Sequence, residues 1–108
     1  MDQGMIDDIT ASLQRRGFYA GKVDLDAAGV QVWAVMEELG EVARMLRRHA
    51  QGVNGLDASK LTTEAADVVI AAVCLLAQCA GEDASTVVAD KLARDELRGW
   101  RHNGTPTS

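Results

Sequence analysis

The absence of proline from the first 105 residues constrains the fold most, because proline is the residue that most strongly interrupts a helix. The only proline is Pro106, near the end of the chain. Alanine, the strongest helix former, recurs throughout, and glycines separate the apolar segments into blocks. The sequence therefore predicts an all-α protein.

Four helices are predicted from the helical spacing of apolar residues and from the residues that end helices. The first is short and ends at Gly17, a loop follows to residue 28, and a long amphipathic helix then covers 28–50. A third helix runs to about residue 80, and a fourth ends near Arg98. The expected N-caps have short polar side chains: Ser59 or Thr63 for the third helix and Asp83 or Ser85 for the fourth.

The third predicted helix is apolar on every side over Ala65–Ala77. Such a helix must be surrounded by protein, and a chain of 108 residues can hardly surround it alone. We therefore expect an antiparallel four-helix bundle whose core is completed by dimerisation, which makes the protein a homodimer, with a tetramer left open. Residues 1–100 form the single domain and 101–108 a polar tail.

Charge and composition exclude several classes of protein. Eleven basic and sixteen acidic residues give a net charge of −5, which argues against a sequence-independent nucleic-acid binder. The uncharged apolar run Val68–Ala77 is too short to span a bilayer, and no basic segment precedes an apolar stretch at the N-terminus. Cys74 and Cys79 lie five residues apart in a helix and cannot bridge, so both are expected as reduced thiols in the cytoplasm.

Two pairs of acidic residues suggest a metal site. Glu38 with Glu41, and Glu64 with Asp67, each lie three residues apart and so share a helix face. If the two antiparallel helices pack side by side, the pairs form a cluster of four carboxylates that needs a cation to stay ionised. Oxygen ligands alone select Mg²⁺, Mn²⁺ or Ca²⁺ over zinc, and we expect Mg²⁺, with Mn²⁺ as a substitute.

A structural interpretation of the same acids stays open. Glu37, Glu38 and Glu41 can form a solvated face, and Glu64 can be a first-turn acid favoured by the helix dipole. Asp67 is harder to explain in this way, because it lies within an apolar segment where an unpaired carboxylate is costly.

The fourth predicted helix carries a cationic stripe, formed by Lys91, Arg94 and Arg98 at positions i, i+3 and i+7. Lysine and arginine near a carboxylate–metal cluster are suited to binding a polyphosphate. Compensation of the helix dipole by basic residues near the C-terminus is the structural alternative.

These motifs resemble those of the MazG-like superfamily of all-α nucleoside triphosphate pyrophosphohydrolases. The string Glu37-Glu38-Leu39-Gly40-Glu41, followed by Glu64-Ala65-Ala66-Asp67, is similar to that family's ExxE and ExxD pair. The segment from Lys91 to Trp100 resembles the Lys-xxx-Asn-xx-Arg-x-Trp segment of small members. Together the motifs cover residues 30–100.

The resemblance implies a metal-dependent hydrolase that cleaves an NTP or dNTP between the α and β phosphates, giving a nucleoside monophosphate and pyrophosphate. It implies metal ligation by the four paired carboxylates, a catalytic role for Glu37 and Glu38, and triphosphate binding by Lys91 and Arg98, with Arg94 on the same stripe. Asp95 stands where the family has asparagine, and it would repel phosphate unless it pairs with a cation.

The nucleobase needs an apolar or stacking wall, which any of the four aromatic residues Phe18, Tyr19, Trp33 and Trp100 can provide, and Trp33 and Trp100 are the tentative candidates. The structural alternatives are core packing for Trp33 and a cover over the bundle end for Trp100.

Phosphoribosyl-ATP pyrophosphohydrolase of histidine synthesis, which shares the fold and acidic pattern, is the nearest rival function. A non-catalytic helical dimerisation module is the rival outside the enzymes. A di-iron bundle is excluded because neither histidine lies three residues after a glutamate.

Overall fold

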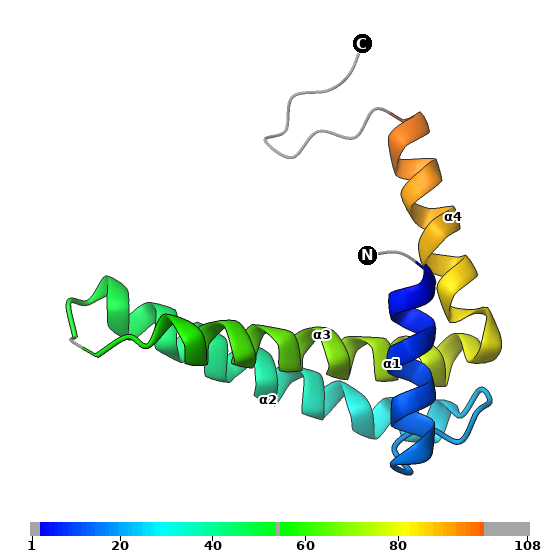
Figure 1. Ribbon diagram of the computed structural model, residues 1–108, viewed down its shortest axis with the longest axis horizontal. Helices are drawn as coiled ribbons and strands as arrows, with labels where there is room; N and C mark the ends of the chain where they lie inside the picture. Colours follow the sequence, from blue (N-terminus) through cyan, green and yellow to red (C-terminus); the bar gives the residue numbers. More distant parts are fainter. Residues whose placement is uncertain (1–2, 54, 99–108) are drawn as a thin grey trace.

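The computed structural model describes residues 3–53 and 55–98, and all regular secondary structure in them is helical (Figure 1). This confirms the all-α prediction. Four α-helices are present, with a short 3₁₀ helix, η1, between the last two: α1 (Gln3–Arg15), α2 (Leu25–Ala50), α3 (Ala58–Ala80), η1 (Gly81–Asp83) and α4 (Ala84–Leu97).

The long helices α2 and α3 form an antiparallel hairpin (Figure 1). Among the described elements, α2 packs against α3 alone, whereas α3 also packs against α1 and α4. The Gln31 side-chain amide Nε2 donates to the carbonyl of Ala71 at 3.1 Å and fixes the register of the two helices. The hairpin is therefore the part of the fold that places the acidic residues of α2 against those of α3.

Aspartates begin both helices of the hairpin, at positions that differ from the predicted ones. Asp24 accepts from the Ala27 N–H at 3.0 Å, so α2 begins at Leu25 rather than at residue 28. Asp57 caps α3 by accepting from two backbone N–H groups, and the predicted caps of this helix, Ser59 and Thr63, were wrong. In both cases the side chain that satisfies the free N–H groups lies earlier in the chain than expected.

The fourth helix begins after the η1 turn, with Asp83 at the N-cap position as predicted, although the Asp83 side chain makes no capping hydrogen bond. Ser85, the other predicted cap, instead donates its hydroxyl to Asp7 of α1. This contact joins α1 to α4 where the two helices lie together across the end of the hairpin (Figure 1).

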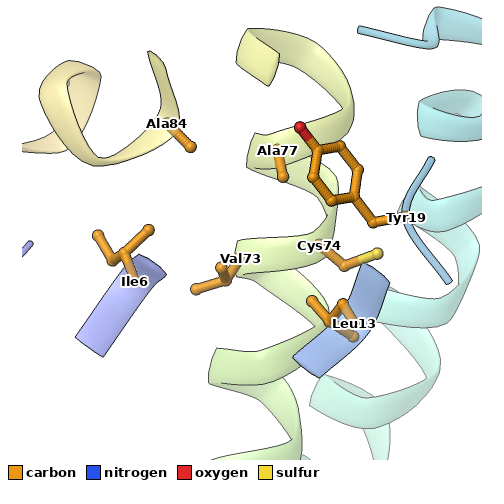
Figure 2. Close-up of a cluster of buried hydrophobic side chains, with 7 residues drawn as sticks. All are labelled: Ile6, Leu13, Tyr19, Val73, Cys74, Ala77 and Ala84. Carbon is orange, nitrogen blue, oxygen red and sulfur yellow. The ribbon is translucent and has the colours of Figure 1, made fainter. Parts of the chain in front are cut away.

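The buried core lies at this end of the hairpin. Side chains from α1, from the turn after it, from α3 and from α4 meet there (Figure 2), and they are Ile6, Leu13, Tyr19, Val73, Cys74, Ala77 and Ala84. The core is small because α1 and α4 cover only the C-terminal half of α3. The remaining length of the hairpin is held together by the contact between α2 and α3 alone.

One long side of the hairpin has no partner among residues 3–53 and 55–98. Large apolar side chains are exposed along α2 with the spacing of a single helical stripe: Leu25, Val32, Met36, Leu39 and Leu46. On α3, Ala65, Val69, Ala72 and Cys79 are also exposed. We call this surface the open face. The prediction that one chain cannot enclose α3 is therefore consistent with the structure, while the four-helix bundle and the dimer-completed core stay predictions.

The apolar character of α3 extends beyond the uncharged run on which the expectation of no membrane span was based. By length and composition, the described residues 58–97 include a stretch apolar enough to cross a bilayer, and only 28% of that stretch is buried. This segment bends at η1 and contains the acidic residues Glu64 and Asp67. Most of its apolar surface is therefore exposed in the part of the chain that the structure describes.

Candidate metal centre

Three carboxylates from two helices meet in the middle of the hairpin. Glu38 comes from α2, and Glu64 and Asp67 come from α3. One oxygen atom of each lies within 4.8 Å of the corresponding oxygens of the other two. The register set by Gln31 and Ala71 explains this meeting, because Glu38 lies two turns after Gln31 while the two acids of α3 lie one and two turns before Ala71. We call these three residues the carboxylate cluster.

The surroundings of Glu38 disfavour its negative charge. The pKa of Glu38 is raised, first by desolvation and then by the negative charges of four neighbouring acids, which are Asp67, Glu64, Glu37 and Glu41. In the described part of the chain, no ion pair within 4.0 Å involves a residue of the cluster. A cation placed among these oxygens would therefore relieve a repulsion that the protein itself leaves in place.

The other two predicted acids lie beside the cluster rather than in it. Glu41 forms an ion pair with Arg44 at 3.0 Å, with both side chains at least half exposed. Glu37 is exposed, and it is near enough to Glu38 to raise the pKa of that residue. The structure therefore brings three of the four predicted metal ligands together. An exposed ion pair contributes only about 0–1 kcal/mol, so a bound cation could draw Glu41 away from Arg44.

The donor set of the cluster fits a hard divalent cation. Carboxylate oxygens are the ligands that Mg²⁺ and Mn²⁺ prefer, and the cluster offers them without histidine or cysteine. Around an octahedral Mg²⁺, ligand oxygens lie about 3 Å apart when adjacent and about 4 Å apart when opposite, given metal–oxygen distances of about 2.1 Å. Small side-chain rotations therefore suffice to close the present spacing of up to 4.8 Å around an ion.

A hollow of about 290 Å³ adjoins the carboxylate cluster. Glu38 and Asp67 line it together with other side chains of α2 and α3, and Leu13, Arg16 and Phe18, from the end of α1 and the turn that follows, complete the wall. Arg16 is the only lysine or arginine among its lining residues. Sequence reasoning named Phe18 only as one of four aromatic candidates for a base wall and missed Arg16, because both residues lie in the turn after α1 and no spacing in the sequence relates them to the acidic motifs.

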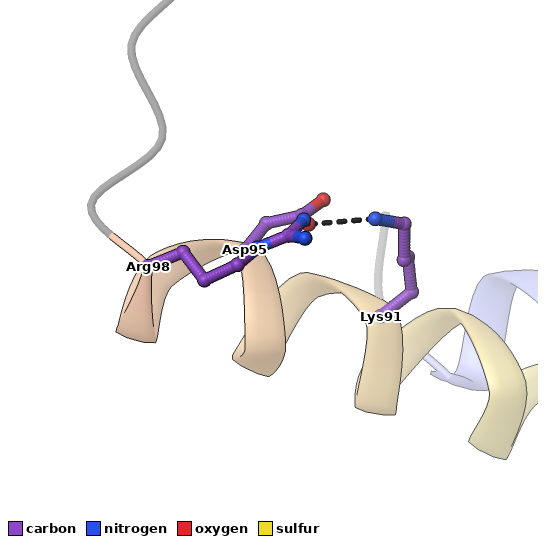
Figure 3. A network of polar contacts seen from close by, with 3 residues as sticks. All are labelled: Lys91, Asp95 and Arg98. Carbon is purple, nitrogen blue, oxygen red and sulfur yellow. Dashed lines mark hydrogen bonds and ion pairs between the residues drawn. The ribbon is translucent and has the colours of Figure 1, made fainter. Parts of the chain in front are cut away.

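The predicted phosphate-binding residues lie elsewhere in the chain. Lys91, Arg94 and Arg98 are on α4, which does not pack against α2, and they line a separate hollow of about 330 Å³. The Lys91 Nζ lies 2.7 Å from an Asp95 oxygen, and Arg98 pairs with the same carboxylate (Figure 3). Within one chain, the structure does not bring these cations to the carboxylate cluster.

Lys91 and Arg98 are therefore the cationic partners of Asp95. An aspartate paired in this way is compatible with a neighbouring phosphate site. Hydrogen bonds from Lys91 contribute most to lowering the pKa of Asp95, and those from Arg98 add to the effect. The negative charge of Asp95 is thus largely matched by its own helix.

Of the two tryptophans predicted to contact a base, the one that the structure describes, Trp33, is not part of the hollow beside the cluster. Trp33 is 66% exposed on α2, which contradicts the core-packing alternative, and it does not line the hollow. Trp100 lies outside the described residues. The aromatic side chain at the hollow is instead that of Phe18.

Comparison of the chain with known protein families, with curated proteins and with solved structures finds no match. The assignment of a function therefore depends on the site itself and on the motifs described above.

Proposed function

We propose that the protein is a metal-dependent nucleoside triphosphate pyrophosphohydrolase. It would cleave an NTP or dNTP between the α and β phosphates and release a nucleoside monophosphate and pyrophosphate. The observation that carries this proposal is the meeting of Glu38, Glu64 and Asp67 within 4.8 Å beside an open hollow. The resemblance of the acidic motifs to those of MazG-like enzymes points to the same reaction.

In this proposal the three carboxylates would hold Mg²⁺ or Mn²⁺, and Glu41 would be available as a further ligand once it leaves Arg44. When bound, the cation would neutralise phosphate charge and lower the pKa of a water molecule. Glu37, exposed beside the cluster, accepts the proton of the attacking water. The water oxygen bonds to the α phosphorus, the bond from that phosphorus to the oxygen shared with the β phosphate breaks, and pyrophosphate leaves with the electron pair of that bond.

The open face supports a second element of the proposal, a homodimer. The exposed side chains of Met36 and Leu39 on α2 are large, whereas the exposed Ala65 and Ala72 on α3 are small. Two hairpins packed through this face would bring large side chains against small ones and form a bundle of four long helices. Such a dimer would also cover the apolar side of α3 that the single chain leaves exposed.

The proposed reaction is tested by measuring pyrophosphate and monophosphate release from a panel of NTPs, dNTPs and phosphoribosyl-ATP. Each substrate is incubated with Mg²⁺, with Mn²⁺ and with EDTA. The proposal expects equimolar pyrophosphate and nucleoside monophosphate that disappear with EDTA. Turnover of phosphoribosyl-ATP alone would replace the proposal by the rival enzyme of histidine synthesis. Absence of turnover with every substrate and metal would favour a non-catalytic dimerisation module.

A further inference from the structure

We propose that Phe18 is the stacking residue for the nucleobase and that the hollow between α1 and the hairpin is the base-binding site. This inference rests on the proposed nucleotide hydrolysis. It replaces Trp33 as the stacking candidate, because Trp33 does not line the hollow. Three observations support this inference: the position of the hollow, the fixed backbone of Phe18, and the two kinds of side chain that line the hollow.

Carboxylates and aliphatic side chains line the same hollow. Glu38 and Asp67 contribute carboxylates to its lining, and Leu13 and Ile70 contribute aliphatic surface. Its volume of about 290 Å³ is close to the lower limit for small-molecule sites, which are mostly apolar with a few polar groups. A ligand in this hollow therefore meets both carboxylates and hydrocarbon.

Phe18 is an exposed aromatic residue on a fixed backbone. Its side chain is 60% exposed, although burial would stabilise it. Its N–H donates to the Leu13 carbonyl at 2.9 Å, which closes α1, and its own carbonyl accepts from Gln78 Nε2 at 3.4 Å and from Cys74 Sγ at 3.5 Å. Gly17, at a φ of +83°, supplies the left-handed residue that this helix ending requires. The turn is thus tied both to α1 and to α3.

The ring itself also has a defined neighbour. The guanidinium carbon of Arg16 lies 5.4 Å from the centre of the Phe18 ring, which is a cation–π distance. A ring on a restrained backbone loses less conformational entropy when a ligand stacks on it than a ring on a mobile one. The backbone of Phe18 is therefore in place before a ligand arrives.

A nucleotide is the occupant whose two parts match the two kinds of side chain that line the hollow. Its phosphates bind to a divalent cation held by carboxylates, and its planar base stacks on an aromatic ring. Inorganic polyphosphates have phosphates for the cation but no base, and free nucleosides have a base but no phosphates. This difference allows the base-binding role of Phe18 to be measured separately from the metal site.

The test compares the wild type with Phe18→Leu, which removes the ring, and Phe18→Tyr, which keeps it. Affinity is measured by isothermal titration calorimetry with a nucleoside triphosphate in Ca²⁺ and with inorganic triphosphate in Ca²⁺, and nucleoside monophosphate binding is followed by NMR. We expect Phe18→Leu to weaken nucleotide binding about tenfold or more and to leave inorganic triphosphate binding unchanged. Phe18→Tyr should restore nucleotide binding. Circular dichroism verifies that each variant is folded.

Equal nucleotide affinity in the wild type and in Phe18→Leu would overturn the base-binding role of Phe18, and the proposed hydrolysis would stand if turnover is observed. An equal loss of nucleotide and inorganic triphosphate binding would also overturn it, because the effect would not depend on the base. If the wild type hydrolyses no substrate but binds nucleoside monophosphates through Phe18, the proposed reaction fails while the base-binding inference is supported.

Discussion

The carboxylate cluster and the charged network of α4 contain similar residues in different surroundings. In α4, Asp95 is matched by Lys91 and Arg98 of its own helix, and its pKa is lowered. In the hairpin, Glu38 is surrounded by other acids, and its pKa is raised. A charge matched within its own helix needs no ligand, whereas acids crowded from two helices favour an external cation. The difference identifies the hairpin, rather than the more conspicuous basic stripe, as the candidate reactive centre.

The largest expected effect is on turnover when the cluster loses one carboxylate. Asp67→Ala should lower the rate of pyrophosphate release at least about a hundredfold, because it removes a ligand from the proposed metal site. It should leave the metal-free protein folded, with an unchanged or higher melting temperature, since one source of repulsion disappears. Asp90→Ala, which removes an exposed acid of α4, is the matched control and should retain full turnover. Equal activity of the two variants would contradict a metal site in the hairpin.

The next largest effect concerns the two sides of α2. Leu39→Glu places a charge on the open face and should raise the dissociation constant of the proposed dimer about thirtyfold or more, as expected for a central interface residue. Val30→Glu changes another exposed apolar residue of α2, which lies outside the stripe, and it should leave association unchanged. Sedimentation equilibrium measures both. A wild-type chain that is monomeric in buffer but binds lipid vesicles would show instead that a membrane covers the open face.

The two charged regions should respond to pH in opposite directions. The raised pKa of Glu38 means that the folded protein binds a proton more readily than the unfolded chain, so stability decreases as pH rises above the ordinary value of 4.5. The lowered pKa of Asp95 means that its stabilising contribution is present above 3.8 and is lost as pH falls through the folded-state pKa. The free energy of unfolding is measured by urea denaturation in EDTA at a series of pH values. Glu38→Gln should abolish the pH dependence that comes from Glu38, and Asp95→Asn should abolish the one that comes from Asp95. The same dependence of stability on pH in both variants would contradict the difference between the two regions.

The smallest expected effect is on stability when the α4 network is broken. Lys91→Ala removes one exposed ion pair and should change the free energy of unfolding by no more than about 0.5 kcal/mol. The same variant tests the phosphate-binding role of Lys91 that the family resemblance implies. Within one chain Lys91 does not reach the carboxylate cluster, so this role would require Lys91 from a second copy of the chain. Weaker nucleotide binding with intact metal binding would sustain that role. Unchanged nucleotide affinity would remove Lys91 from the site.

The sequence predicted the helices and the acidic pairing because both depend on spacing within one helix or between consecutive helices. The positions of Glu38 and Asp67 follow from helix periodicity and from one antiparallel packing step. The N-cap at Asp57 was missed because several nearby residues have similar capping preferences, and tertiary packing decides among them. The hollow with Phe18 was not predictable, because the crossing of α1 over the end of the hairpin depends on long-range packing that no local pattern specifies.

The central claim is that Glu38, Glu64 and Asp67 bind a divalent cation, and titration with Mn²⁺ followed by electron paramagnetic resonance tests it most directly. The free Mn²⁺ signal decreases as the ion binds, and the measurement requires neither a substrate nor turnover. The account predicts saturable Mn²⁺ binding that Mg²⁺ displaces and that Glu38→Gln and Asp67→Asn each weaken strongly, while Asp95→Asn leaves it intact. Absence of saturable binding, or binding that persists in both cluster variants, would contradict the claim.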